Sequence, residues 1–164
     1  MKFASISDEF FKICYDKEMM DNSNRRPYLV VLRLKYNGQR QDFAIPFRSN
    51  IPKATPREQY FPLPPRKSTK ENRKHGLHFI KMFPIRKEYL QKFHTDKDPY
   101  YQMLTDYVNK RTKQIINEAQ EYLSKLESGL RMNFATDIQA MILTLQELFP
   151  AKEAAATNER SNAE

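Results

Sequence analysis

The pair Asn37-Gly38 lies between two runs of alternating residues, and it constrains the fold more than any other feature of the sequence. Both residues accept the positive φ that a two-residue hairpin turn requires. Residues 28–36 and 42–47 carry apolar side chains at every second position, which is the period of a strand with one buried face. The pattern predicts an antiparallel hairpin. Because Pro46 has no N–H to donate, we expect its strand to be an edge strand or to end near that residue.

The segments around this hairpin are shorter and less regular. Ser5 or Ser7 is placed to cap a short helix that follows the first few residues. In chain order the sequence predicts a short strand at 2–6, a polar loop at 19–27, an irregular proline-rich segment at 46–65, a basic loop at 66–76 and a mostly buried strand at 77–85.

The last third of the chain has the three- and four-residue apolar spacing of amphipathic helices. Pro99 suits a first helical position, with Asp96 or Asp98 near the cap, and Gly129 suits the position after the end. The residues between them predict either one long helix or two helices broken near Arg111.

A further helix is predicted over residues 136–150, whereas residues 151–164 have no apolar period and predict a disordered tail. Strands come first and helices last, joined by a tight hairpin rather than by long crossovers. This order predicts an α+β domain over residues 1–150, built as a small antiparallel sheet or half-barrel with packed helices.

The net charge of +8 is concentrated in the middle of the chain. Residues 48–92 contain twelve Lys and Arg residues against three Glu, a net charge of +9, and the remaining segments nearly cancel. Clustered positive charge favours a polyanionic partner, because each neutralised phosphate releases counterions. The alternative is a solubilising surface, although mixed signs usually serve that purpose. We therefore expect a nucleic acid partner.

Several classes of function lack their sequence signals. No run approaches the roughly 18 apolar residues of a membrane span, and the N-terminus lacks the apolar core of a secretion signal. Cys14, the one cysteine, is expected to be a buried structural thiol and indicates a reducing, cytoplasmic setting. Glycine-rich phosphate loops, G-x-S-x-G and H-E-x-x-H are absent, and His75 and His78 have no third ligand in sight. We therefore expect no metal and no cofactor.

Polar and basic residues cluster where the second hairpin strand ends, at Arg48, Ser49, Asn50 and Lys53. Arg26 precedes the first strand, and since a hairpin brings these two ends together, we expect Arg26 beside Ser49. Such groups suit metal-free RNA cleavage, in which a base removes the ribose 2′-hydroxyl proton and the oxygen attacks the adjacent phosphate. Cations stabilise the transition state, and an acid protonates the leaving 5′-oxygen, which yields a 2′,3′-cyclic phosphate and a 5′-hydroxyl.

Each of these residues also has a plainer interpretation. A Ser-Asn pair after a strand commonly forms a turn, and Arg48 also suits a solvated strand end. His78 is either a structural histidine or a proton-transfer group, and Tyr28 either stacks on a base or packs in the core. The residues expected to contact RNA are Tyr28, Arg33, Asn50, Arg57, Arg66, Lys67, Lys70, Arg73, Lys74 and Lys81.

Six segments in order over residues 1–150 resemble the ToxN/AbiQ family, the endoribonuclease toxins of type III toxin–antitoxin systems, and look most like its CptN branch. The segments are MKFASIS, PYLVVLRL, AIPFRSNIP, HFIKMFPI, PYYQMLTDYVNK and MNFATDIQAMI. The resemblance implies a compact, partly open antiparallel β-barrel related to the MazF/Kid toxins, with helices packed around it. It also implies metal-independent cleavage of A-rich RNA, with roles in phage defence by abortive infection or in maintenance.

The resemblance further implies the partners. They are cellular or phage RNA as substrate and a small pseudoknotted antitoxin RNA, which the toxin cuts from a repeated transcript. Toxin and antitoxin RNA would then alternate in a closed assembly that inhibits the enzyme.

The resemblance also points to particular residues. The key serine of the family follows a strand end of the type A-x-P-x-T-S, and Ser49 matches it in AIPFRS. Arg48 stands where the family often has threonine, and it could supply a cation to the transition state. The family lysine two residues after the serine is Ile51 here, so Lys53 is the nearest replacement. Arg26 corresponds to a basic residue before the first hairpin strand.

The candidate catalytic residues are therefore Ser49, Arg48, Arg26, Lys53 and His78, the last of which replaces another residue type in better-known members. The rival hypothesis is a non-catalytic RNA-binding module that uses the same basic groove. A DNA-binding regulator is disfavoured, because the basic excess lies on predicted loops and strands without a recognition helix. We expect neither DNA nor a membrane as a partner.

Overall fold

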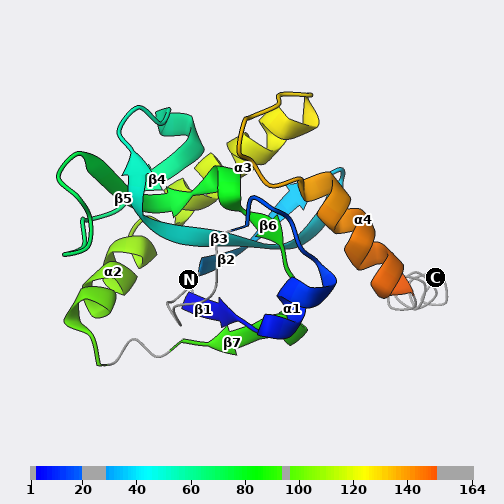
Figure 1. Cartoon of the computed structure of the whole chain (residues 1–164), viewed down its shortest axis with the longest axis horizontal. Helices are drawn as coiled ribbons and strands as arrows, with labels where there is room; N and C mark the ends of the chain where they lie inside the picture. The colour runs from blue at the N-terminus through cyan, green and yellow to red at the C-terminus, as the bar shows by residue number, and fades with distance from the viewer. Residues whose placement is uncertain (1–2, 20–28, 94–96, 151–164) are drawn as a thin grey trace.

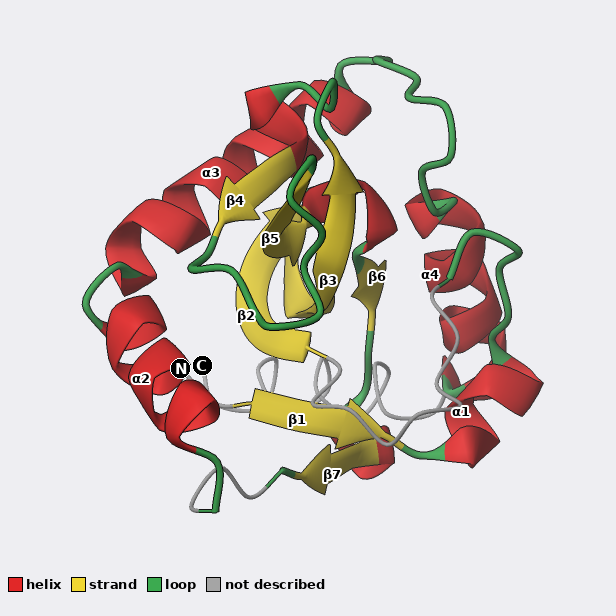
Figure 2. Ribbon diagram, turned by 60° about the vertical axis from the view of Figure 1, so that its left-hand side comes forward, coloured by secondary structure: helices red, strands yellow, loops and turns green. Residues whose placement is uncertain are grey.

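The computed structural model describes residues 3–19, 29–93 and 97–150. In these ranges one antiparallel sheet of seven strands runs in the order β4-β5-β3-β2-β1-β7, with β6 beside β3. Helices α2 and α3 flank the sheet on one side, and α1 and α4 flank it on the other (Figure 1; Figure 2). The elements are β1 (Phe3–Ile6), α1 (Asp8–Ile13), β2 (Leu29–Tyr36), β3 (Gln39–Pro52), β4 (Tyr60–Pro62), β5 (Arg73–His78), β6 (Phe83–Pro84), β7 (Leu90–Lys92), α2 (Pro99–Asn109), α3 (Thr112–Glu127) and α4 (Ile138–Leu148).

This arrangement confirms the predicted α+β class. The sheet does not close, since no pairing joins its two end strands β4 and β7 in the described ranges. None of the described helices is long and apolar enough to cross a membrane.

The predicted hairpin is confirmed, and its turn sets the register of the sheet. Asn37 and Gly38 have φ values of 49° and 77°, as a two-residue primed turn requires. From this turn β2 and β3 pair without interruption to Leu29↔Pro46. The even-numbered side chains of β2 from Val30 onward are buried, as the alternation predicts.

The prediction that the second hairpin strand is an edge strand or ends near Pro46 is wrong, because β3 pairs along both edges and continues to Pro52. Antiparallel pairs alternate between hydrogen-bonded and non-hydrogen-bonded. The closing pair Tyr36↔Gln39 is hydrogen-bonded, and counting every second pair from it shows that Leu29↔Pro46 is a non-hydrogen-bonded pair. The backbone nitrogen of Pro46, which carries no hydrogen, therefore points away from β2, toward the other edge of β3. At that edge the pairing with β6 ends at Ala44 and the pairing with β5 begins at Phe47. Proline is therefore tolerated in the interior of this strand.

The boundaries predicted between residues 46 and 85 also need correction. The irregular segment 46–65 contains the end of β3 and all of β4, and the end of the basic loop 66–76 belongs to β5. The strand predicted at 77–85 is instead the end of β5, a 3-10 turn at Phe79–Lys81, and β6.

Gly76 explains the close packing of β5 against β4, since a Cβ on it would lie 2.5 Å from the carbonyl oxygen of Phe61 in β4.

The helical region confirms the alternative with two helices. α2 begins at Pro99, and the Asp98 carboxylate accepts a hydrogen bond from the Tyr100 N–H at 2.9 Å. The break falls at Arg111, whose guanidinium lies 3.6 Å from the centre of the Tyr107 ring. α3 then runs to the turn at Gly129, which has a φ of 97°.

The N-terminal ends of α4 and α1 differ in their capping. Asp137 caps α4 through a 3.1 Å bond from the Ala140 N–H. Ser7 occupies the position before α1, although its hydroxyl makes no capping hydrogen bond. The predicted tail 151–164, residues 20–27 of the predicted loop and Asp96 lie outside the described residues.

Two apolar clusters hold the sheet between its helices. The larger joins β2, β3 and β5 to α2 and α3, and the smaller joins β1 and β6 to α1 and α4. Cys14 lies in the smaller cluster, where burial and the nearby Asp16 raise the pKa of its thiol to about 11. The thiol stays protonated near neutral pH, as expected for a structural cysteine.

Replacing Gly76 by alanine should separate β4 from β5. The added methyl group would meet backbone rather than a flexible side chain, so we expect Gly76→Ala to lower the free energy of unfolding by about 1–3 kcal/mol. Urea denaturation of wild type and variant at neutral pH measures the difference.

Gly38→Asn is the matched control. No atom lies within 4 Å of a Cβ at Gly38, and asparagine tolerates positive φ. Equal losses of stability in the two variants would contradict a role for the close approach at Gly76.

Candidate functional site

A β-bulge interrupts β3 at the predicted site. Arg48 pairs with Gly76 of β5, but Ile51 pairs with Lys74, so two residues of β3, Ser49 and Asn50, oppose one residue of β5. Such bulges bend the strand and redirect side chains, and they are frequent beside functional sites. Within the described residues the hydroxyl of Ser49 has no hydrogen-bond partner. The sequence had predicted a turn or an active-site rim at these positions, and the structure shows an irregular strand.

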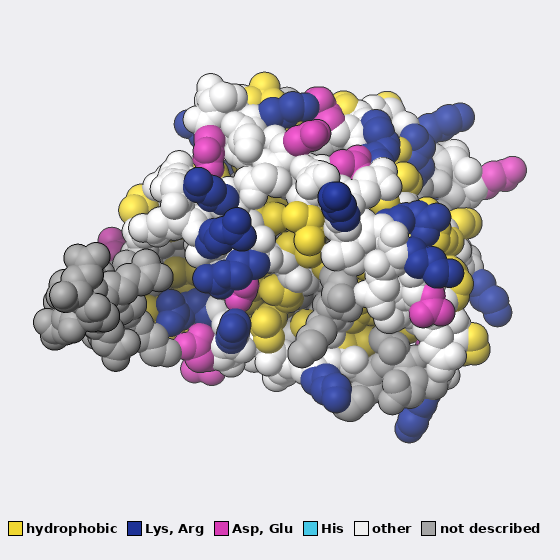
Figure 3. All heavy atoms as spheres, turned by 180° about the vertical axis from the view of Figure 1, so that it is seen from behind, with side chains coloured by type: hydrophobic (Ala, Val, Ile, Leu, Met, Phe, Trp, Pro, Cys, Tyr) yellow, Lys and Arg dark blue, Asp and Glu magenta, His cyan; other side chains and the backbone are white. Residues whose placement is uncertain are grey.

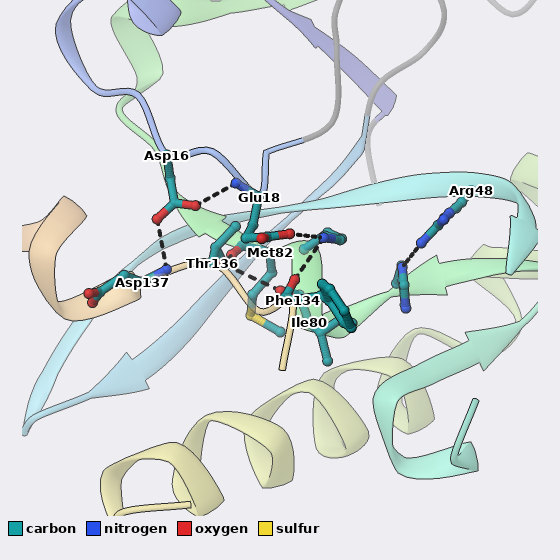
Figure 4. Close-up of polar contacts among 10 residues, drawn as sticks. Asp16, Glu18, Arg48, Ile80, Met82, Phe134, Thr136 and Asp137 are labelled. Atoms are coloured by element: carbon teal, nitrogen blue, oxygen red, sulfur yellow. Dashed lines mark hydrogen bonds and ion pairs between the residues drawn. The ribbon is translucent and has the colours of Figure 1, made fainter. Parts of the chain in front are cut away.

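Arg48 of β3 contacts His78 of the neighbouring strand β5 (Figure 4). The Nη1 atom of the half-buried Arg48 lies 3.4 Å from Nδ1 of His78, which is itself buried. Because a guanidinium can only donate, Nδ1 must accept and the imidazole proton is assigned to Nε2. Nε2 is buried and has no hydrogen-bond partner among the described atoms.

The electrostatics of this contact keep the imidazole neutral. Burial, with a further contribution from the cations Arg48 and Lys81, lowers the pKa of His78 to about 3. The pKa of Arg48 is also lowered, by burial and by the nearby Arg73. The guanidinium remains charged all the same, since its reference pKa is far above neutrality. The result is a desolvated cation beside an uncharged histidine.

Asn50 fastens the basic loop against β3. Its Nδ2 donates to the carbonyl oxygen of Ser68 at 3.3 Å, and its Oδ1 accepts from the N–H of Lys70 at 3.0 Å. Both halves of the amide are therefore used inside the protein. The bonds hold the backbone of Lys70 against Asn50, which follows Ser49 in the chain.

Further cations lie along the same end of the sheet. Arg73 pairs with Pro52 and Lys74 with Ile51, and the Lys74 ammonium donates to the Tyr60 hydroxyl at 2.9 Å. The side chains of Lys53 and Lys67 are exposed. The structure therefore brings together Arg48, Ser49, Asn50, Lys70, Arg73, Lys74 and His78.

Four other predicted contacts are engaged elsewhere. Arg33 forms a 3.4 Å ion pair with Asp42, at the opposite end of β3. Arg57 forms a 2.8 Å ion pair with Glu118 of α3 and lies over the rings of Tyr60 and Phe61; Arg66 lies over the rings of Tyr100 and Tyr101. These side chains tie the loops to the helices.

Lys81 is the fourth of these residues, and it is almost fully buried. Its ammonium lies 2.9 Å from Oε2 of Glu18 and 2.7 Å from the carbonyl oxygen of Phe134, as Figure 4 shows. It thus joins the segment after α1 to the segment before α4. Arg26 and Tyr28 lie outside the described residues.

Sequence reasoning missed the residues that support this end of the sheet. Buried His75 faces the bulge, and its Nδ1 lies 2.8 Å from both the Pro64 carbonyl oxygen and the Tyr100 hydroxyl. Burial lowers the pKa of His75, so this histidine is also neutral near pH 7. The spacing of these residues in the sequence was one available signal. If this segment is a strand, Gly76 and His78 lie on one face and His75 lies on the other.

No metal cluster accompanies these residues. Within ranges 3–19, 29–93 and 97–150, no group of three or more His, Cys, Asp and Glu side chains could hold an ion.

Comparisons with known proteins support the fold alone. No protein-family model and no curated protein matches the sequence. The structure does match a solved structure described as "A processed non-coding RNA regulates a bacterial antiviral system", with a TM-score of 0.63 and 14% identity. The match covers 89% of this chain and 98% of that chain. The chain therefore shares that fold, which supports the ToxN-like fold implied by the sequence resemblance but not the CptN branch.

Proposed function

We propose that this protein is a metal-independent endoribonuclease, the toxin of a type III toxin–antitoxin pair. Its substrate would be A-rich RNA, and a small pseudoknotted RNA would be both its product and its inhibitor. Two lines support this proposal besides the sequence resemblance. The shared fold belongs to a structure described in terms of a processed non-coding RNA and a bacterial antiviral system. The basic end of the sheet also has cations that could stabilise the transition state of metal-free cleavage.

The observation that carries the proposal is the bulge in β3. Ser49 follows Arg48 in the chain, Arg73 and Lys74 lie on the facing strand β5, and the backbone of Lys70 is bonded to Asn50. Phosphates of an RNA strand would be attracted to this end of the sheet. Arg48 would stabilise the phosphorane, because a fixed cation in a partly desolvated site acts more strongly than one in water.

Ser49 would orient the reacting groups. Its hydroxyl can donate to a phosphate oxygen or accept from the ribose 2′-hydroxyl, and it is not committed to another side chain within the described residues. Lys53 is exposed and directly follows β3, three residues after Asn50, so it remains part of the proposal as a phosphate contact. Arg26 also remains part of the proposal, from the sequence resemblance alone.

His78 receives a positioning role in place of proton transfer. A neutral imidazole with a pKa near 3 is a poor base at neutral pH, but it holds the Arg48 guanidinium by accepting its hydrogen bond. Buried histidines that orient a charged neighbour serve in this way because their second nitrogen stays protonated.

A non-catalytic RNA-binding module is the second candidate function. One observation favours it: the two histidines of β5 both have lowered pKa values, and in the described part of the site we find no group poised to titrate near pH 7. Such a module would bind RNA at the same cations without cutting it.

Cleavage in the presence of EDTA separates the two functions. We expect purified protein to cut A-rich RNA under these conditions and to leave 2′,3′-cyclic phosphate and 5′-hydroxyl ends. Ser49→Ala should slow the cleavage about a hundredfold or more, since it removes a group that acts on the reacting atoms. Ser124→Ala, at an exposed position on α3, is the control and should cut at the wild-type rate.

Two results would defeat the catalytic proposal. Wild-type protein that binds RNA without cutting it would favour the binding module. Undiminished cleavage by Ser49→Ala would remove Ser49 from the mechanism.

The neutral state of His78 predicts a pH dependence of stability. The pKa of His78 is lower in the folded protein than in the unfolded chain, so the unfolded chain binds more protons between about pH 3 and 6.5. Stability from this group is complete above that window and is lost as the pH falls through it, by at most about 1.4 kcal/mol per pH unit.

Replacing His78 by glutamine should therefore flatten the fall in unfolding free energy between pH 6.5 and 4. Denaturant unfolding at a series of pH values measures both slopes. Parallel curves for wild type and His78→Gln would show that His78 is not held neutral.

A further inference from the structure

Positive charge alone does not locate the reacting centre that RNA cleavage would need. On the face seen in Figure 3, Lys and Arg side chains gather in more than one place. Cleavage also needs a group that removes the proton of the ribose 2′-hydroxyl. His78 does not suit this task, because its pKa is about 3 and its Nδ1 already accepts from Arg48. The other histidine of β5 is His75.

His75 lies directly opposite the bulge. The strand pairs on either side of the bulge leave Ser49 and Asn50 of β3 facing this single residue of β5. Facing residues of antiparallel strands are separated by roughly 5 Å between their Cα atoms. The backbones of Ser49 and His75 are therefore neighbours, although the two residues are far apart in the sequence.

The contacts of His75 fix the position of its imidazole proton. Nδ1 lies 2.8 Å from the carbonyl oxygen of Pro64, which can only accept a hydrogen bond. A polar contact this short needs a hydrogen between the two atoms, and only Nδ1 can supply it. The Tyr100 hydroxyl lies 2.8 Å from the same nitrogen and donates to the Pro64 oxygen at 2.9 Å. The neutral ring has one proton, so Nε2 carries an unprotonated lone pair.

This nitrogen is held in place and is not committed to another group. Within the described residues, the hydrogen bonds of His75 all use Nδ1. The ring is almost fully buried, and its centre lies 6.4 Å from that of Phe47 and 6.0 Å from that of Tyr100. Because burial lowers the pKa of His75, Nε2 is free to accept a proton at neutral pH without first losing one.

Arg66 supplies a cation close to this histidine. Its guanidinium lies 5.3 Å from the centre of the Tyr100 ring, and its charge contributes to the lowered pKa of His75. Stacking covers one face of the guanidinium and leaves the N–H donors at its edge for a phosphate. A bound phosphate would offset the repulsion between Arg66 and an imidazolium formed at His75.

We propose that His75 is the general base of the cleavage reaction, an inference that rests on the proposed function. Nε2 takes the proton of the ribose 2′-hydroxyl while that oxygen forms a bond to the adjacent phosphorus. The bond from phosphorus to the 5′-oxygen breaks, and the 5′-oxygen takes a proton from water. The imidazolium then releases its proton to solvent. Ser49, on the facing strand, holds the 2′-hydroxyl or a phosphate oxygen within reach.

The variant His75→Asn tests this role. Asparagine keeps an N–H near the place of Nδ1, so it can still donate to Pro64, but it has no nitrogen that accepts a proton. We expect cleavage of A-rich RNA in EDTA to slow about a hundredfold or more. Binding of an uncleavable 2′-O-methyl oligonucleotide should keep the wild-type affinity, and thermal unfolding checks that the variant folds.

The pH dependence of cleavage separates a base from a structural residue. For wild type, kcat/KM should fall as the pH drops below 6.5, because protonation of His75 removes the base. The residual activity of His75→Asn should lack this fall. His78→Gln is the matched control and should keep it, because a group with a pKa of about 3 does not titrate in this range. Circular dichroism at each pH checks that the protein is folded.

Nitrogen NMR of the wild-type imidazoles tests the proton position without any measurement of activity. We expect the proton of His75 on Nδ1, and a proton on Nε2 would overturn the proposal. Wild-type cleavage without an acidic fall, or undiminished cleavage by folded His75→Asn, would also overturn it and leave the proposed function intact. Wild-type protein that binds RNA without cutting it would remove both.

Discussion

The pairing of β3 on both of its edges is the constraint on which the rest of the structure depends. The Asn37-Gly38 turn sets the register of β3 against β2. In that register Pro46, which has no N–H donor, faces the other edge of β3, at the point between its pairing with β6 and its pairing with β5. β3 can then continue to the bulge at Ser49 and Asn50. The candidate site therefore exists because a hairpin strand extends beyond its partner and acquires a new one.

The second edge of β3 also fixes the electrostatics of the site. β5 lies close to β4 because Gly76 has no side chain, and this packing buries His78 beneath Arg48. Burial keeps the imidazole uncharged, so it can accept a hydrogen bond from a guanidinium that would repel an imidazolium. The same sheet end collects Arg73 and Lys74, which raises the local positive potential.

Local features could be read from the sequence, whereas features that depend on distant partners could not. The Asn37-Gly38 turn and the Asp98 cap follow from residues within one turn of each other, and both were predicted correctly. The strand at 73–78 was missed because its pattern is polar and its stability comes from β3 and β4. Likewise, the positive charge of Lys81 suggested an RNA contact. Lys81 is instead buried in an ion pair with Glu18, which is 63 residues away in the sequence. The candidate role of Ser49 could be proposed from the sequence, whereas the bulge that contains it could not, because the bulge depends on the pairing of β3 with β5.

We propose that RNA binds at the bulge of β3. Amide chemical-shift mapping with a 2′-O-methyl A-rich oligonucleotide, which cannot be cut, tests this binding site. We expect the largest shifts at Arg48, Ser49, Asn50, Arg73 and Lys74, because these amides lie in the bulge and in the strand that faces it. Shifts confined to other parts of the molecule, with these five amides unmoved at saturation, would contradict it.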